Sequence, residues 1–356
     1  MKFLMIDIGA GTLDILYYDS DRSVHYKAVV KSPALTVAEK LSAIDGDLLI
    51  TGVEMGGGSL ASLLKEKARS ARVLITKSAG ATINHNIKKV ESLGVEVVED
   101  EEVKGFRRSG RYKCFDISDL EFERIKGIVQ GMGLPFSFDV VGICAQDHGV
   151  PEPGMSHLDY RHNILKEKLG KQPFPHEMLY SSGDIPQTFN RLKSIAVRAE
   201  QFPASEVYVM DSGMAAILGG TLDPLARRKD KKIILDIATS HTVGAAFEGD
   251  EFFGSFEYHT VDITTDILDS LLVNLADGKL DHSEILAQGG HGAYIRKSFG
   301  FNNLDLILST GPKRSLSYGS ELNIVPGAPF GDNMMTGAAG LLEAIRIKKG
   351  LQKFTV

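Results

Sequence analysis

KFLMIDIGAGTLDILYYD, residues Lys2–Asp19, predicts two strands joined by a tight turn. β-Branched and aromatic residues on either side favour strands, and the two glycines permit a turn that other residues would strain. Backbone N–H groups in such a turn converge on one point, and together with the Thr12 hydroxyl they suit a phosphate group. Asp7, near the end of the first strand, is positioned to hold Mg²⁺ through water, because Mg²⁺ keeps several waters and takes few protein carboxylates.

The same pattern is also compatible with a simple polar hairpin. It is not a Walker P-loop, because no G-K-[ST] follows and no helix begins at the turn. A second copy favours the phosphate interpretation: the strand Ile233–Ile237 carries Asp236 and is followed by a turn with Thr239 and Ser240, then by a strand that begins near Thr242. Two such hairpins facing each other could clamp a triphosphate, with one aspartate from each around a single metal ion.

Composition limits the alternatives. A chain of 356 residues suggests two domains, and 43% hydrophobic with 24% charged residues is typical of a globular protein. The net charge of −6 argues against a nucleic-acid partner. Cys114 and Cys144 are the only cysteines, so neither a disulfide framework nor a cysteine-rich metal site is expected. No apolar run reaches membrane-spanning length, and Asp7 interrupts the first apolar run too early for a signal peptide, so we expect a cytoplasmic protein without a membrane partner.

Strands and helices alternate from Asp47 onward, which predicts a mixed α/β sheet with crossover connections. We expect a first domain over residues 1–220, with insertions at about 99–113 (a charged loop or surface hairpin) and 150–186 (an irregular insertion or lid). A second domain is expected over 221–333, and a C-terminal helix over 334–356 that returns to the hinge and the first domain.

Polar residues follow one deeply buried strand. Phe138–Ala145 is almost continuously apolar, as expected for a strand covered on both faces, and it leads into Gln146, Asp147 and His148. Such sheets bind ligands at the carboxyl ends of their strands. These three residues therefore either contact a substrate or form a satisfied polar turn.

The other histidines are expected to be structural. His157, His162 and His176 are too scattered for a metal site, and His241 and His259 are expected to be ordinary strand histidines. The run from Gly289 to Gly292 is expected to be a loop, with a neighbouring role in base binding left open.

On these motifs the chain resembles the superfamily of acetate and sugar kinases, heat-shock chaperone ATPases and actin. Asp7–Asp14 (DIGAGTLD) and Asp236–Gly244 (DIATSHTVG) are similar to its two phosphate loops, Ile307–Arg314 (ILSTGPKR) to its adenosine loop, and Gly337–Gly340 to its small-residue connecting helix. The resemblance implies two related ribonuclease H-like α/β domains facing a nucleotide cleft, with ATP and Mg²⁺ as cofactors and Asp7 and Asp236 at the metal. The residues implied to bind the nucleotide are Asp7, Gly9, Ala10, Gly11, Thr12, Asp236, Thr239, Ser240, Thr242, Thr310, Gly311 and Lys313.

Sugar kinases add two further similarities. Gly142–Gly149 (GICAQDHG) resembles their substrate strand, and Asp211–Gly219 (DSGMAAILG) resembles a segment whose aspartate accepts the proton of the acceptor hydroxyl. The implied catalytic residues are Asp211, Gln146 and Asp147, with His148 at the substrate. Asp211 would be the general base, a role that needs position more than unusual acidity. Gln146 could instead orient a water for hydrolysis.

The resemblance favours an ATP- and Mg²⁺-dependent phosphotransferase or ATPase that acts on a small hydroxylated acceptor or on water. A nucleotide-switched activator or partner protein is the alternative, although activators of this fold hold a cluster with cysteines that this chain lacks. A third hypothesis is a nucleotide-binding module without catalysis, because Ala238 stands where the family usually has glycine. The nearest branch is an uncharacterised prokaryotic one, some of whose members have been labelled pyruvate formate-lyase activating enzymes; two cysteines do not favour that radical chemistry. The sequence identifies neither the acceptor nor a protein partner.

Overall fold

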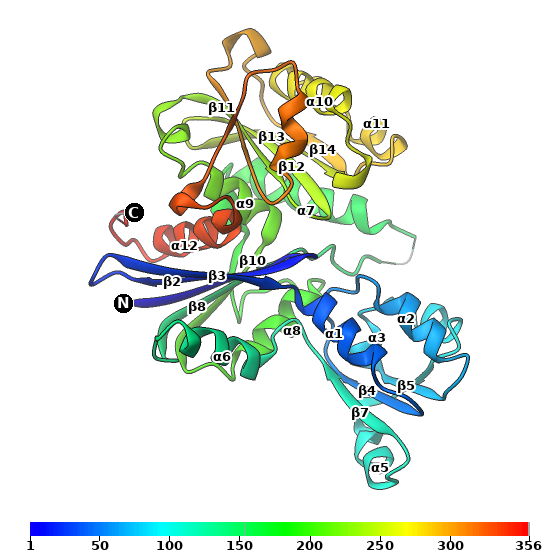
Figure 1. The fold of residues 1–356 in the computed structure, drawn as a ribbon. Coiled ribbons are helices and arrows are strands. Elements are labelled where there is room, and N and C mark those ends of the chain that lie inside the picture. The colour runs from blue at the N-terminus through cyan, green and yellow to red at the C-terminus, as the bar shows by residue number, and fades with distance from the viewer. Residues whose placement is uncertain (153, 355–356) are drawn as a thin grey trace.

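The computed structural model describes residues 1–152 and 154–354. Two six-stranded sheets lie on either side of a central layer of helices (Figure 1). The first sheet has the order β3-β2-β1-β8-β10-β9, formed by β1 (Lys2–Ile8), β2 (Thr12–Asp19), β3 (Val24–Lys31), β8 (Phe138–Ala145), β9 (Leu179–Ser181) and β10 (Ala204–Asp211). The second has the order β14-β13-β12-β11-β15-β16, formed by β11 (Lys231–Ile237), β12 (His241–Glu248), β13 (Glu251–His259), β14 (Gly292–Ile295), β15 (Leu306–Thr310) and β16 (Ile324–Pro326).

The two sheets share one topology. β1 pairs antiparallel with β2 and parallel with β8, and β11 pairs antiparallel with β12 and parallel with β15. Apart from the edge strands β9 and β14, each sheet is a three-stranded antiparallel meander whose first strand is continued by two parallel strands. The molecule therefore has the predicted architecture of two related ribonuclease H-like α/β domains.

Helices cover both faces of the sheets. They are α1 (Pro33–Ser42), α2 (Leu60–Lys67), α3 (Lys77–Gly80), α4 (Ile87–Glu91), α5 (Val103–Arg108), α6 (Phe122–Gly131), α7 (His157–Lys171), α8 (Asn190–Ala199), α9 (Ser212–Gly220), α10 (Thr265–Asp277), α11 (His282–Ala287) and α12 (Thr336–Lys348). In Figure 1, α9 and α12 lie between the two large sheets, whereas α6 and α8 lie on the far side of the first.

Strand β1 shows how the sequence builds these layers. Successive side chains point to opposite faces of a strand, and all of Phe3–Ile6 is buried. Phe3 and Met5 pack in the cluster that contains α9 and α12, whereas Leu4 and Ile6 pack in the cluster that contains α6 and α8. The continuous apolar run thus places β1 at the centre of a three-layer structure.

α9 and α12 are packed backbone to backbone. A Cβ atom added to Gly340 would lie 1.8 Å from the carbonyl oxygen of Ala215, and one added to Gly219 would lie 1.8 Å from that of Thr336. Glycine is therefore required where the two helices cross, at the junction between the domains.

A third, four-stranded parallel sheet has the order β6-β5-β4-β7 and is formed by β4 (Leu48–Gly52), β5 (Val73–Thr76), β6 (Glu96–Val98) and β7 (Lys113–Ile117). It forms a separate unit beside the first domain in Figure 1. The predicted loop or hairpin over 99–113 is wrong: this stretch forms a short 3-10 turn and α5. A reciprocal capping box between Glu99 and Glu102 begins the helical segment, which a count of charged residues does not reveal.

The stretch 150–186 is more ordered than the irregular insertion predicted from its composition. It contains α7, and β9 pairs antiparallel with β10 at the edge of the first sheet. α7 is joined to the second domain, because Arg161 forms an ion pair with Glu257 on β13 and Asp159 Oδ1 lies 3.1 Å from His282 Nε2.

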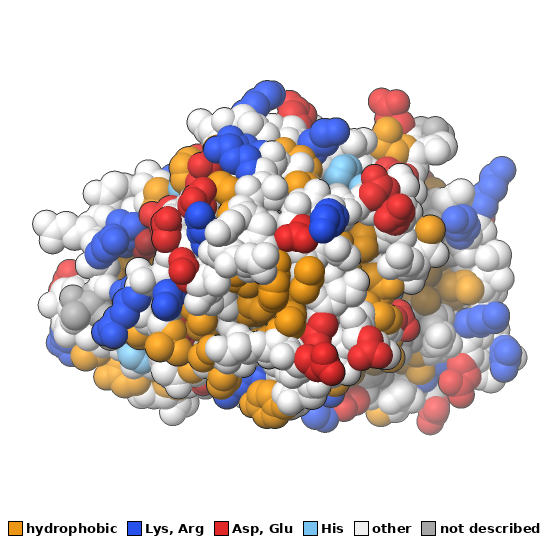
Figure 2. Space-filling view, turned by 90° about the horizontal axis from the view of Figure 1, so that it is seen from above, with side chains coloured by type: hydrophobic (Ala, Val, Ile, Leu, Met, Phe, Trp, Pro, Cys, Tyr) orange, Lys and Arg blue, Asp and Glu red, His pale blue; other side chains and the backbone are white. Residues whose placement is uncertain are grey.

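Among the described residues, no helix has the length and apolar character needed to cross a bilayer. The face shown in Figure 2 carries acidic and basic side chains intermixed with hydrophobic ones. This face therefore does not present the continuous basic surface that nucleic-acid binding would need.

Candidate functional site: a cleft between two matched hairpins

The β1–β2 and β11–β12 turns have the same geometry. The Gly9 amide donates to the Thr12 carbonyl at 3.0 Å, and the Ala238 amide donates to the His241 carbonyl at 3.1 Å. The two turns also approach each other closely, since a Cβ atom on Gly11 would lie 2.7 Å from Thr239 Oγ1. The internal repeat in the sequence thus corresponds to two hairpins that face each other across the domain junction.

Both turns line one cavity of about 350 Å³. The residues predicted for the site that line it are Asp7, Gly9, Ala10, Thr12, Gln146, His148, Asp236, Thr239, Ser240 and Gly311. Glycine is required at Gly311, whose φ is +88°, because a Cβ there would lie 2.6 Å from the Ile237 carbonyl oxygen. The loop after β15 is therefore held directly against the end of β11.

Three carboxylates of the cavity lack a counter-charge. Burial raises the pKa of Asp7 to about 6, burial and the Asp7 charge raise that of Asp14 to about 8, and the same two causes raise that of Asp236 to about 7. Asp14 Oδ1 is buried without a hydrogen-bond partner, and among the described residues no ion pair joins these three groups to a lysine or arginine. These carboxylates are hard oxygen ligands of the kind that Mg²⁺ takes, but among the described residues the oxygens of all three do not lie within 4.8 Å of one another.

Four predicted nucleotide-binding residues do not line the cavity. Gly11 is one of them, because it packs against Thr239 of the opposite turn. The Thr242 hydroxyl is buried 3.0 Å from that of Thr260, and the Thr310 hydroxyl is hydrogen-bonded to Thr336 at the start of α12. Lys313 is also absent from the lining. In a strand, alternate residues face opposite sides, so a hydroxyl next to the turn can as easily face the helical layer as the ligand.

Asp211 and Asp147, proposed for catalysis, lie outside the cavity lining. Asp211 accepts two hydrogen bonds from Arg161 Nη2, at 3.0 and 2.8 Å, and caps α9 by accepting from the Met214 amide at 3.1 Å. Asp147 accepts from the amides of Gly149 and Leu192 at 2.8 and 2.9 Å. Both carboxylates are thus fully engaged in structural bonds in this conformation.

Gln146 and His148 do face the cavity. The Gln146 amide nitrogen donates to Glu257 of the second domain, so this side chain joins the two domains. Burial, assisted by the nearby Arg161 charge, lowers the pKa of His148 to about 3, so its ring is neutral at physiological pH. Its Nδ1 is buried without a hydrogen-bond partner.

Other lining residues were not predicted. Gly56–Gly58 approaches from the third sheet, and Arg191 lines the wall while forming two hydrogen bonds to Asp119, at 2.7 and 2.9 Å. Asp119 also accepts from the Gly56 amide at 3.1 Å, which fixes the glycine loop. The triple glycine was a usable signal, but Arg191 and Asp119 are far apart in sequence and belong to no recognisable motif.

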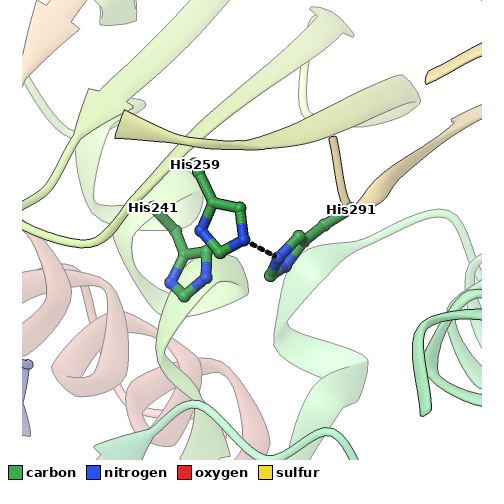
Figure 3. Close-up of side chains that lie close together, drawn as sticks. All are labelled: His241, His259 and His291. Carbon is green, nitrogen blue, oxygen red and sulfur yellow. Dashed lines mark hydrogen bonds between the residues drawn. The ribbon is translucent and has the colours of Figure 1, made fainter. Parts of the chain in front are cut away.

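The histidines of the second domain form a group that the sequence did not indicate. His241 and His259 lie on strands as expected, but they are directly opposite each other in the β12–β13 register. His291, in the predicted loop before the unpredicted strand β14, joins them (Figure 3). His241 and His259 are strand histidines as predicted, but the sequence did not show that they meet a third ring, because cross-strand pairing determines who their neighbours are.

A family model described as "Putative pyruvate format-lyase activating enzyme (DUF1786)" matches residues 55–316, about three quarters of the chain. No curated protein matches the sequence.

Several solved structures are distantly similar in fold. The AlfA filament from a B. subtilis plasmid is 10% identical with a TM-score of 0.39, and the alignment covers 96% of this chain and 98% of AlfA. Inorganic polyphosphate/ATP-glucomannokinase from Arthrobacter sp. strain KM is 13% identical with a TM-score of 0.37, covering 98% and 99%. A Bacteroides thetaiotaomicron protein with an actin-like ATPase fold and unknown function is 10% identical with a TM-score of 0.37, covering 96% and 95%. Similarities at this level do not indicate an activity for this chain.

Proposed function

The chain belongs to the DUF1786 family, and we propose that it binds a nucleoside triphosphate with Mg²⁺ in the cleft between its two domains and transfers the γ-phosphoryl group to a small hydroxylated acceptor or to water. One observation carries the proposal: two hairpin turns of identical hydrogen bonding line a single cavity together with three carboxylates that lack a counter-charge. A polyphosphate with its cation supplies the charge and the oxygen ligands that this arrangement lacks.

Each part of the cavity has a distinct task in this proposal. The backbone of the turns at Gly9–Gly11 and Ala238–Ser240, with the Thr12 and Thr239 hydroxyls, would hold phosphate oxygens. Asp7 and Asp236 would hold Mg²⁺, through water or directly. The bound cation would neutralise charge that develops on the transferred group. The protein would otherwise act by positioning its substrates.

The contacts of Gln146 and Asp211 make Gln146 the better placed of the two to orient the attacking nucleophile. The Gln146 amide nitrogen is bound to Glu257, which leaves its carbonyl oxygen to accept a hydrogen bond from a water or an acceptor hydroxyl. Asp211 can act as a base only after its carboxylate leaves Arg161. Transfer to water therefore needs less rearrangement than transfer to an acceptor through Asp211.

A nucleotide-dependent switch is a second candidate. The polar links Gln146–Glu257 and Arg161–Glu257 join the first domain and α7 to β13, and Arg161 also holds Asp211. A change in domain closure would rearrange all of these contacts, which is how a bound nucleotide could be signalled to a partner.

The family description names an activating enzyme, but the cysteines of this chain do not favour radical chemistry on an iron–sulfur cluster. Iron–sulfur clusters in proteins are held mainly by cysteine thiolates, commonly four of them. This sequence has two cysteines, and Cys114 is exposed on β7 whereas Cys144 is buried in β8. They belong to different sheets and cannot jointly ligate a cluster.

Thermal unfolding with ATP and with ADP, each with and without Mg²⁺, tests binding. We expect Mg·ATP to stabilise the wild type by about 2.7 kcal/mol at a hundred times its dissociation constant. Asp7→Asn should remove most of this stabilisation. Asp45→Asn, which alters an exposed carboxylate that does not line the cavity, should retain it. The absence of any nucleotide effect on the wild type would refute the proposal.

Release of phosphate and ADP then separates the two candidates. Turnover that is lost in Gln146→Ala supports hydrolysis assisted by this residue. Tight Mg·ATP binding without turnover, alone or with small polyols, supports the switch.

A further inference from the structure

Three imidazole rings converge at one corner of the second sheet, beside the cleft (Figure 3). His241 begins β12, His259 ends β13 directly opposite, and His291 is placed by its amide, which donates to the Glu257 carbonyl at 2.9 Å. The ring centroids are separated by 4.2 Å (His259–His291), 4.5 Å (His241–His291) and 5.0 Å (His241–His259). One nitrogen from each ring lies within 4.8 Å of the others.

The contacts of Glu257 determine how His291 is protonated. Arg161 Nη1 donates to Glu257 Oε2 at 2.8 Å, so this carboxylate is paired with a cation. The ionised carboxylate can only accept, so at 3.3 Å from His291 Nδ1 it fixes the proton on that nitrogen. In the neutral ring, His291 Nε2 therefore carries a lone pair. It can accept a hydrogen bond from His259 Nε2, which lies 2.9 Å away.

The hydrogen bonds within the cluster leave it incompletely satisfied. A single proton, on His259 Nε2, is shared with His291. His241 Nε2 is buried and has no hydrogen-bond partner. One nitrogen of each ring thus lies within 4.8 Å of the other two, and a buried polar atom without a partner, such as His241 Nε2, costs free energy.

We propose that His241, His259 and His291 bind one divalent transition-metal ion of the Zn²⁺ class. Neutral imidazole nitrogens suit Zn²⁺, Cu²⁺ and Ni²⁺, whereas Mg²⁺ and Ca²⁺ take oxygen ligands. As Nε2 of His259 coordinates, its proton moves to Nδ1 of the same ring, so that both histidines bind the ion as neutral imidazoles. Zn–N bonds of about 2.0–2.1 Å in a tetrahedron place the nitrogens about 3.3 Å apart, so small ring rotations suffice.

The surroundings of the cluster match those of a metal site. A ligating histidine usually donates its second ring N–H to a carboxylate, and Glu257 provides this contact for His291. Three protein ligands leave a fourth position, as in catalytic zinc sites. His241 lines the cavity between the domains, and its ring centroid lies 6.3 Å from that of His148, the residue predicted to contact the substrate. The ion would therefore border the cleft near His148. The site is separate from the carboxylates at Asp7 and Asp236 and does not depend on nucleotide binding.

Metal binding by the full-length protein, without nucleotide, tests the proposal. After treatment with EDTA and dialysis, Co²⁺ titration should give the intense visible absorption of a four-coordinate ion and saturate at one equivalent, and Zn²⁺ should abolish this spectrum. His259→Gln and His291→Gln should each weaken binding at least about tenfold. His25→Gln, the same substitution on β3 of the first domain, should bind like the wild type.

A second measurement uses only the wild-type protein, so that a variant that fails to fold does not decide the matter. Zn²⁺ should raise the unfolding temperature of the EDTA-treated protein, and the same concentration of Mg²⁺ should not. Failure of the wild type to bind Co²⁺ or Zn²⁺, or equal binding by the His291 and His25 variants, would overturn the proposal. Either result leaves the nucleotide proposal untouched, because no nucleotide is present.

Discussion

Replacing Gly340 by alanine should destabilise the protein, although alanine is the better helix former. The added Cβ would lie 1.8 Å from the Ala215 carbonyl oxygen and 2.5 Å from the Gly219 amide nitrogen. Both atoms belong to the backbone of α9, so neither can rotate away, and the two helices must separate by more than an ångström. Separation would disturb the buried side chains packed around the crossing, including Ala338 and Leu341.

The expected cost combines two opposing terms. Overpacking a close-packed interior typically costs about 1–3 kcal/mol, and a backbone contact belongs at the upper end. Alanine recovers about 1 kcal/mol of helix propensity. The net loss is therefore about 2 kcal/mol. With about 2.1 cal/mol/K of unfolding entropy per residue over 356 residues, the unfolding temperature should fall by about 3 °C.

Gly127→Ala is the matched control. Gly127 lies inside α6, and a Cβ there would have no heavy atom within 4 Å. The same chemical change should therefore raise stability by about 0.5–1 kcal/mol. Calorimetric unfolding of the two variants should give shifts of opposite sign. Equal shifts, or a gain for Gly340→Ala, would show that α9 and α12 do not cross at backbone contact.

Two further predictions concern buried charge and pH. Arg161→Met should destabilise by about 3–5 kcal/mol in urea unfolding, because it leaves the carboxylates of Asp211 and Glu257 buried without their partner; a loss under 1 kcal/mol would mean that these groups are solvated. Burial, with the neighbouring His282 charge, lowers the pKa of His162 to about 4 in the folded protein. Between pH 6.5 and 4 the unfolded chain therefore binds more protons than the folded one, and the free energy of unfolding falls as the pH drops through this range. His162→Gln should recover about 1–2 kcal/mol of this loss at pH 5 and change little at pH 8, and parallel pH profiles for variant and wild type would contradict the assignment.

Most of the fold could be predicted from hydrophobic patterning. The apolar runs behind β1, β8 and β11 are long enough to be recognised as buried strands, and the turn residues after β1 and β11 mark the repeat. Short edge strands escaped notice. β7 is largely exposed and β14 has four residues, so neither carries a hydrophobic period, and each exists because a neighbouring strand offers unpaired backbone groups.

Some residues of the candidate site could also be predicted from the sequence, and others could not. Residues in the turns could be identified because glycine, threonine and aspartate next to a strand have a local reason to be there. Arg191 and Asp119 could not, since their bond joins positions 72 residues apart. Asp211 shows the converse: its motif suggests a base, but its bond to Arg161 on α7 is invisible in the sequence.

The sequence by itself determined the two domains, the pair of hairpin turns and the acidic residue before each turn, because strand pairing and turn conformation depend on residues adjacent in the chain. Only the tertiary structure decided which of those residues share a cavity and which histidines share a corner. His241, His259 and His291 come from three segments, and their meeting depends on strand register and on one backbone hydrogen bond to Glu257. Chemistry that needs several side chains at one point is a property of distances, and distances between remote segments are set by packing.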